Sequence, residues 1–129
     1  MAKGFNEHKE RLAAIQGFGK VLAKRAGFIC EWCGGNEGLK PYDLAPEREV
    51  EEETLALLCE VCRGYAGGGR VDADQVRGYE GALWHALPLI AEGAARVLAR
   101  TNADWAWEAI DGSGLDDTFK AALQKTRRH

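Results

Sequence analysis

Two Cys-x-x-Cys pairs constrain this chain more than any other feature of its sequence. Cys30 and Cys33 lie in "CEWC", and Cys59 and Cys62 lie in "CEVC". Two thiolate pairs supply four soft ligands for a tetrahedral Zn²⁺ ion, and the two-residue spacer lets one tight turn aim both sulfurs at the same ion. The segment between the pairs is longer than the most regular spacing of about 15–20 residues, which fits a longer hairpin. The sequence therefore predicts one zinc ion per chain, held by all four cysteines.

Four protein ligands would close the coordination sphere of this ion. Catalytic zinc keeps one position for water or substrate, whereas a closed site replaces part of the hydrophobic core of a small module. The alternatives are four unrelated buried cysteines or two redox pairs. A thioredoxin-like redox motif, however, uses a single pair within a βαβ unit. The pattern therefore favours a structural zinc ion and a protein that is not an enzyme.

Length and charge limit the other classes of function. The chain has 129 residues, enough for one ordinary domain. It has no run of about 18 apolar residues and no signal-type start, so we expect a cytoplasmic protein without a membrane partner. The net charge of −3 divides into +4 over residues 1–29, −7 over residues 30–62 and zero over residues 63–129. A broad basic surface for nucleic acid is therefore not expected, and any such contact would be local.

The apolar pattern divides the chain into three parts. Over residues 7–26, apolar side chains recur at three- and four-residue steps, which predicts an amphipathic helix ending at Gly27. Next, two short extended segments, "LKPYDLA" and "TLALL", flank an acidic tip, and "GYAGGGR" reads as a flexible loop. The remainder is mostly helical, with Pro88 at a helix start. We expect Asn102 to cap the next helix, and either Asp116 or Ser113 to open the last one.

The predicted fold class is therefore α+β and mostly α. A small β module of the zinc-ribbon or treble-clef type occupies residues 28–64 and is held by the four-cysteine site. It is flanked by the N-terminal helix, residues 1–27, and by a helical C-terminal region, residues 65–129.

The order "CEWCG", "YDLAP" and "LLCEVCR" resembles the cysteine-framed HNH nucleases. In those enzymes the middle motif is Asp-His, whose histidine activates water for attack on a phosphodiester and whose acidic residue helps to hold a second, catalytic metal. Asp43 and Pro46 match this frame, but Leu44 stands at the histidine position and can neither take a proton nor bind a metal. The resemblance implies a degenerate nuclease frame that lacks the group performing the chemistry.

The chain also resembles the PhnA family, small bacterial proteins named after an alkylphosphonate-utilisation gene cluster, over most of residues 20–119. The same front motifs are followed by "ALWHALPLIAEGAARVLART", "DWAWEAID" and "LDD". The matching residues of this second part are Trp84, Pro88, Arg96, Leu98, Trp105, Asp111, Leu115 and Asp116. The resemblance implies a zinc-ribbon-like front and a helical back, and little about activity.

Several other side chains are weaker candidates for contact with nucleic acid or a protein partner. They are Lys20, Lys24 and Arg25 in the basic N-terminal helix, Trp32 in the first cysteine pair, and Arg63 after the second pair. We expect Trp32 to be exposed, whereas Trp84, Trp105 and Trp107 are more typical of a core than of base stacking.

The histidines and the acidic tip are weak candidates for ligands or catalytic groups. His85 can be a ligand or a base, but a lone histidine of this kind is more often packed or solvent-facing, and His8 and His129 lie near the chain ends. The acidic tip around Glu49 and residues 51–53 is more typical of a solvated turn than of a cation site.

Three functions follow in order of preference. The first is a non-catalytic zinc-binding protein that acts through an unknown protein partner or through self-association. The second is a nucleic-acid-binding module of the degenerate HNH type. The third is a hydrolase linked to phosphonate metabolism, for which Asp43 is the one residue that can be nominated.

Overall fold

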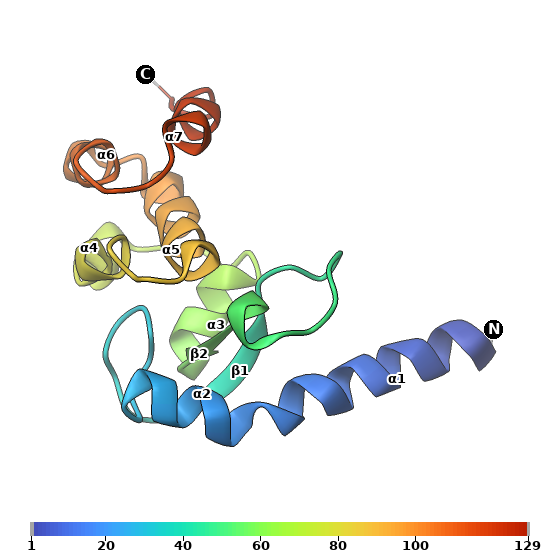
Figure 1. Ribbon diagram of the computed structural model, residues 1–129. Helices are drawn as coiled ribbons and strands as arrows, with labels where there is room; N and C mark the ends of the chain where they lie inside the picture. The colour runs from blue at the N-terminus through green and yellow to red at the C-terminus, as the bar shows by residue number, and fades with distance from the viewer. Residues whose placement is uncertain (1, 129) are drawn as a thin grey trace.

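Helices make up most of the structure, and a single two-stranded sheet lies among them (Figure 1). The computed structural model describes residues 2–128, and the side chains of residues 7–128. The elements are α1 (Ala2–Gly17), α2 (Gly19–Ala26), β1 (Lys40–Asp43), η1 (Glu52–Thr54), β2 (Leu55–Leu58), α3 (Glu60–Ala66), η2 (Ala73–Val76), α4 (Tyr79–Ala82), α5 (Pro88–Thr101), α6 (Asp104–Asp111) and α7 (Asp117–Gln124). The predicted mixture of many helices and a small β part is confirmed.

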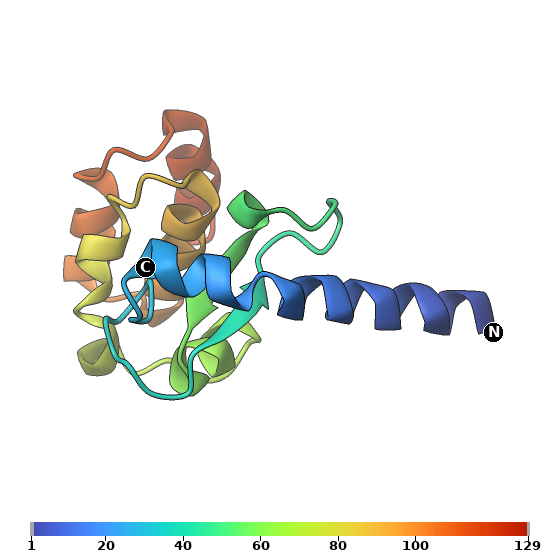
Figure 2. The same cartoon turned by 60° about the horizontal axis from the view of Figure 1, so that its bottom comes forward.

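The predicted N-terminal helix is two helices, separated at Phe18. Gly27 ends α2 in the left-handed conformation with φ 69°, as its sequence position predicted. Ile15 and Leu22 are buried, but Leu12 is 47% exposed. This exposure arises because α1 extends away from the rest of the molecule as an arm, which Figures 1 and 2 show from two directions.

Strands β1 and β2 form an antiparallel hairpin in which Tyr42 faces Ala56. All four residues of β2 are buried because helices cover both faces of the sheet. Leu55 and Leu57 belong to a small cluster with Leu22 of α2, whereas Ala56 and Leu58 belong to the larger core. Alternating side chains thus join the hairpin to the N-terminal helices on one face and to the helical region on the other.

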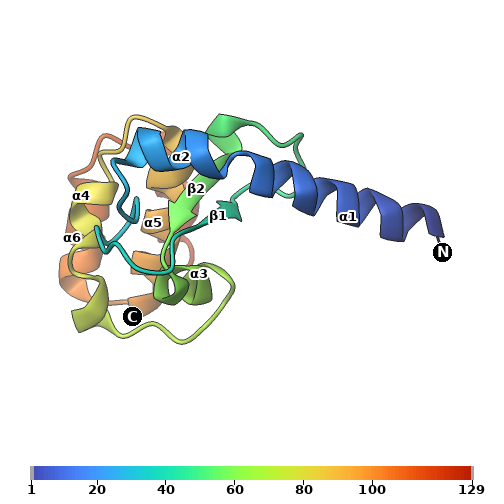
Figure 3. The same ribbon diagram turned by 90° about the horizontal axis from the view of Figure 1, so that it is seen from below.

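Helix α5 organises the helical region. Pro88 occupies its first turn, where the missing N–H costs no hydrogen bond. Ile90, Ala94 and Leu98 are completely buried, and α3, α4, α6 and α7 all contact this helix. Figure 3 shows α5 behind the hairpin and α2 when the molecule is seen from below. The core around α5 includes Cys30 and Cys62, so the cysteine cluster and the helical region share one hydrophobic interior.

Two local predictions were wrong. The loop expected from Gly64 begins later, because α3 continues through Ala66 and buries Tyr65, whose hydroxyl donates to Gln75 Oε1. Asn102 ends α5 in the left-handed conformation, φ 55°, and the N-cap of α6 is its neighbour Ala103. Asparagine tolerates this conformation better than most residues, so the same side chain suits either helix end. The predicted N-cap at Asp116 is confirmed.

Among residues 2–128, none of the helices combines the length and the apolar character that crossing a membrane requires.

Candidate metal centre

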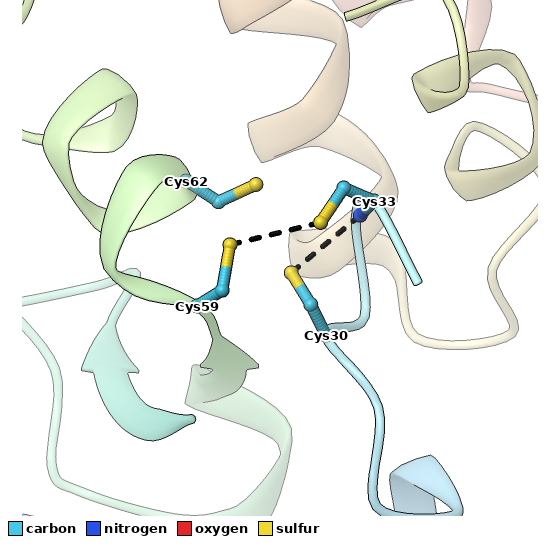
Figure 4. Close-up of side chains that lie close together, drawn as sticks. All are labelled: Cys30, Cys33, Cys59 and Cys62. Carbon is cyan, nitrogen blue, oxygen red and sulfur yellow. Dashed lines mark hydrogen bonds between the residues drawn. The ribbon is translucent and has the colours of Figure 1, made fainter. Parts of the chain in front are cut away.

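The four cysteines converge on one point. Their Sγ atoms all lie within 4.8 Å of one another, and the Sγ atoms of Cys33 and Cys59 are 3.6 Å apart. Figure 4 shows two of these side chains on the loop after α2 and two at the start of α3. Cys30 and Cys62 are buried, Cys59 is half-buried and Cys33 is exposed. The cluster therefore has one side in the core and one side toward solvent.

A tight turn positions the first pair. The N–H of Gly34 donates to the carbonyl oxygen of Cys30 at 2.9 Å, and the N–H of Cys30 donates to the carbonyl oxygen of Gly35 at 2.6 Å. Gly34 adopts φ 81°, which favours glycine at this position. Two further amides donate to sulfur: Cys33 N to Cys30 Sγ at 3.5 Å and Gly35 N to Cys33 Sγ at 3.3 Å. These donors favour the thiolate form that a metal needs.

The second pair is positioned by a helix. Cys59 is the N-cap of α3, and Cys62 lies one turn later on the same side. The hydroxyl of the buried Tyr79 donates to Cys62 Sγ at 2.7 Å, which adds a donor from α4 to the sulfur cluster.

The thiols perturb one another. The hydrogen bond from Cys62, together with nearby backbone N–H groups, lowers the pKa of the Cys30 thiol to about 4. Burial raises the pKa of the Cys33 thiol to about 11, and the hydrogen bond to Cys30 raises the pKa of Cys62. Burial also raises the pKa of the Tyr79 hydroxyl, which keeps it a donor. These hydrogen bonds thus favour the thiolate form of Cys30.

The sulfur positions suit a tetrahedral ion. Metal–sulfur bonds of about 2.3 Å in tetrahedral geometry place the sulfurs about 3.8 Å apart. The Cys33–Cys59 separation of 3.6 Å and the upper limit of 4.8 Å for the whole set are close to this value. The cluster is therefore compatible with a four-thiolate metal site.

Glu31, inside the first pair, ties this loop to three other elements. Its carboxylate, only 3% exposed, accepts hydrogen bonds from Arg25 of α2 at 2.5 and 3.2 Å and from the backbone N–H of Leu57 at 2.8 Å. His85 lies 2.9 Å from the second carboxylate oxygen. The Nδ1 atom of His85 accepts from the N–H of Leu87 at 3.0 Å, so its Nε2 carries the proton donated to Glu31. Sequence reasoning missed this role of Glu31, because nothing in "CEWC" distinguishes a buried glutamate from a solvated one.

Comparison with protein-family models, with curated proteins and with solved structures found no match. The chemistry of the centre must therefore be judged from its own residues.

The two positions that carry the HNH resemblance serve the packing of the hairpin. Asp43 accepts a hydrogen bond from Arg11 Nε at 2.9 Å and another from the N–H of Ala45 at 3.2 Å. Leu44 is half-buried and packs where Gly93 of α5 approaches the hairpin. Asp43 and Leu44 thus contribute an ion pair and apolar packing at the end of the hairpin.

The four basic residues among the candidate contact residues divide into two groups. Lys20 and Lys24 are exposed on α2. Arg25 is bound to Glu31 and to two backbone carbonyls, and Arg63 donates to the carbonyl oxygens of residues 38 and 58 at 2.5 and 2.7 Å. Both arginines therefore brace the cysteine loops.

The expectation that Trp32 is exposed was wrong. Its side chain is 3% exposed, its Nε1 donates to the carbonyl oxygen of Ile90 at 3.0 Å, and its ring centroid lies 5.5 Å from that of Tyr79. The first cysteine loop turns this ring toward α5 rather than toward solvent. Trp84, which was expected in the core, is 64% exposed. Trp107 is buried, as predicted.

The remaining candidates agree with the simpler interpretations. His85 is half-buried and held by Glu31, and His8 is exposed, whereas His129 lies outside the described residues. In the acidic tip, Glu49, Glu51 and Glu53 are exposed.

Proposed function

We propose that this chain is a non-catalytic zinc-binding protein of the PhnA-like type, in which the four cysteines hold one structural Zn²⁺ ion. The observation that carries the proposal is the convergence of four thiol sulfurs, all within 4.8 Å of one another, from two separate elements. Four thiolates suit zinc because it prefers soft ligands in tetrahedral geometry. The hairpin between the first cysteine loop and α3, which carries the second pair, supports a module of the zinc-ribbon or treble-clef type.

The bound ion would supply a cross-link between the first cysteine loop and α3. Cys30 and Cys33 anchor one side of it, and Cys59 and Cys62 anchor the other. The surrounding residues orient these ligands: Tyr79 donates to Cys62, and Glu31 holds the first loop against β2. With four protein ligands, the site leaves no position for substrate.

The proposed non-catalytic role rests on the closed set of four thiol ligands and on the pairing of Asp43. Among the side chains of residues 7–128, the four cysteines are the one group of three or more metal-ligating residues with donor atoms close together. Asp43, which the nuclease resemblance would assign to a catalytic metal, is bound to Arg11 instead.

Action through protein contacts or self-association is supported by the exposed apolar surface. Among the side chains of residues 7–128, the large apolar ones that are exposed are Leu12, Val21, Phe28, Ile29, Val61 and Trp84. Two of these lie on the N-terminal helices and two on the turn that leads into the first cysteine loop, which are surfaces that a partner can reach.

Native mass spectrometry combined with metal analysis tests the proposal. We expect one zinc ion per chain, with the Cys59→Ser variant losing it and the Val61→Ser variant keeping it, since Val61 is an exposed neighbour outside the cluster. The same spectra report the oligomeric state. A second bound metal, or phosphodiester or phosphonate hydrolysis that disappears when zinc is removed, would contradict a non-catalytic role.

A further inference from the structure

A cavity of about 500 Å³ lies where α5, α7 and the C-terminal segment meet. Its lining residues are Arg96, Ala99, Arg100, Leu123, Thr126 and Arg128. Half of them are arginines and none is acidic, although the whole chain carries a net charge of −3. Sites for small molecules have volumes of about 300–1,000 Å³, so this cavity is large enough for a ligand.

Arg100 is fixed by the backbone. Its Nη1 donates to the carbonyl oxygen of Tyr65 at 2.5 Å, and its Nη2 donates to the carbonyl oxygen of Gly69. A guanidinium has five N–H groups, so these two bonds hold the group in place while further donors remain. The two carbonyls are neutral and therefore leave the positive charge of Arg100 without a counter-charge.

Two hydrogen bonds between Asn102 and the backbone of Arg128 hold Arg128 beside the cavity. Asn102 Nδ2 donates to the carbonyl oxygen of Arg128 at 2.8 Å, and the N–H of Arg128 donates to Asn102 Oδ1 at 3.2 Å. One guanidinium nitrogen of Arg128 lies 3.4 Å from the carbonyl oxygen of Arg100. The hydrogen bonds to Asn102 thus place a second arginine beside the first, although the two are far apart in sequence.

Arg96 adds a third positive charge one helical turn before Arg100. Like charges at this spacing repel each other on an isolated helix. Within residues 7–128, no carboxylate lies within 4.0 Å of the Arg100 or Arg128 guanidinium, and Arg96 has one distant partner, Glu92, at 3.8 Å. By contrast, Arg11 and Arg25 each contact a carboxylate at 2.9 Å or less. Among the described residues, Arg100 and Arg128 therefore have no nearby counter-charge, whereas Arg96 has the distant Glu92 and places its guanidinium over the Phe119 ring, 5.1 Å from the centroid.

We propose that this cavity binds a ligand through its phosphate groups. Planar guanidinium groups bind phosphate oxygens with paired hydrogen bonds, and three of them around one cavity suit a dianion or a chain of phosphates. Arg96 and Arg100 also line a neighbouring cavity of about 330 Å³, but the carboxylate of Asp43 lines that cavity too, so the phosphate site is confined to the first cavity. A free phosphorylated molecule and a nucleic-acid backbone share this chemistry.

This site is independent of the zinc proposal, because none of its lining residues is a cysteine or contacts one. Failure of either proposal would leave the other standing.

Nuclear magnetic resonance of the zinc-loaded, ¹⁵N-labelled chain tests phosphate binding in the arginine cavity. Inorganic phosphate and a short single-stranded DNA serve as separate probes. We expect saturable shifts of the arginine side-chain signals of Arg96, Arg100 and Arg128. The Arg96→Gln and Arg128→Gln substitutions should each weaken binding roughly tenfold. Arg48→Gln, at an exposed arginine on the hairpin tip, is the matched control and should leave the affinity unchanged.

The two probes identify the source of the phosphate. Saturable phosphate binding that depends on Arg96 and Arg128 supports a small phosphorylated ligand, whereas DNA binding with the same dependence and weak phosphate binding supports a nucleic acid. The proposal is overturned if neither probe saturates, if sodium chloride at equal ionic strength produces the same shifts, or if Arg48→Gln reduces binding as much as the cavity variants do.

Discussion

Gly93 shows how a single hydrogen atom in place of a side chain sets the position of the metal centre. A Cβ atom at this position would lie 2.7 Å from Trp32 Cζ2 and 3.4 Å from Leu44 Cδ2. The lack of a side chain lets α5 approach the first cysteine loop closely enough for Trp32 to donate to the carbonyl oxygen of Ile90. The burial of Trp32 thus depends on a glycine far away in the sequence.

We expect Gly93→Ala to lower the free energy of unfolding by about 1–3 kcal/mol, because the Trp32 ring is rigid and must shift as a whole. Gly81→Ala is the matched control, since a Cβ there meets no atom within 4 Å and alanine favours the helix. Urea denaturation of both variants measures the difference. Equal stability of the two variants would show that the contact between α5 and the loop is looser than described.

At the same scale, Glu31→Gln removes a buried charge from between Arg25 and His85. We expect a loss of roughly 3 kcal/mol, since breaking one side of a buried ion pair leaves the other charge uncompensated. The loss should also weaken zinc retention, measured by competition with a chromogenic chelator. Glu37→Gln, an exposed glutamate on the same loop, provides the control and should match the parent chain.

At the scale of elements, α1 is held to the body by few contacts. Arg11 forms an ion pair with Asp43 and donates to the carbonyl oxygen of Ala45 at 3.1 Å, and Ile15 is buried in the small cluster with Leu22. The side chains of residues 7–10 and 12–14 of this helix are exposed. Asp43 therefore acts here as an anchor for an arm.

We expect Asp43→Asn to release α1 while leaving the rest of the fold intact, because Arg11 loses its charged partner. Hydrogen exchange should speed up at the amides of α1, whereas the amides of α5 keep their protection. Glu49→Gln makes the same change of charge at an exposed site of the hairpin tip and should have no effect on α1. Unchanged exchange in α1 after Asp43→Asn would contradict the anchoring role.

At the scale of the whole molecule, one core joins the cysteine cluster to the helices. Cys30, Cys62 and Trp32 share this core with α5 and with Trp107 of α6. The boundary that the sequence suggested between the zinc-binding module and the helical region, after residue 64, falls within α3. Residues on both sides of it belong to the same hydrophobic core. If the cluster holds zinc as proposed, removal of the ion should therefore also destabilise the helical region.

We expect a strong chelator to unfold the helical region together with the front module in one transition. Structural zinc contributes apparent free energies of about 10–16 kcal/mol in small modules, which is as large as the whole stability of a typical domain. Near-ultraviolet circular dichroism reports the packing of the tryptophans, and far-ultraviolet dichroism reports the helices. A metal-free chain that keeps both signals would show that the helical region folds without the ion.

Local chemistry determined much of this structure from the sequence alone. Several sequence signals act through neighbours a few residues away, and the structure has each of them in place. They are the repeated Cys-x-x-Cys spacing, Gly27 after a helical pattern, Pro88 before one, the acidic N-cap Asp116 and the apolar run of β2. The amphipathic pattern also found most of the buried face of α5.

Only the tertiary structure decided which polar and aromatic groups are buried. Four side chains depend on partners tens of residues away in the sequence. Trp32 contacts α5 and Glu31 contacts β2, whereas Asp43 binds α1 and Arg100 binds α3 and the loop after it. Periodicity reports which face of an element is apolar, but it carries no information on which two elements meet. The cysteine cluster could be predicted from the sequence because its four members lie in two short motifs. The arginine cavity, by contrast, arises only when the C-terminal segment folds back onto α5.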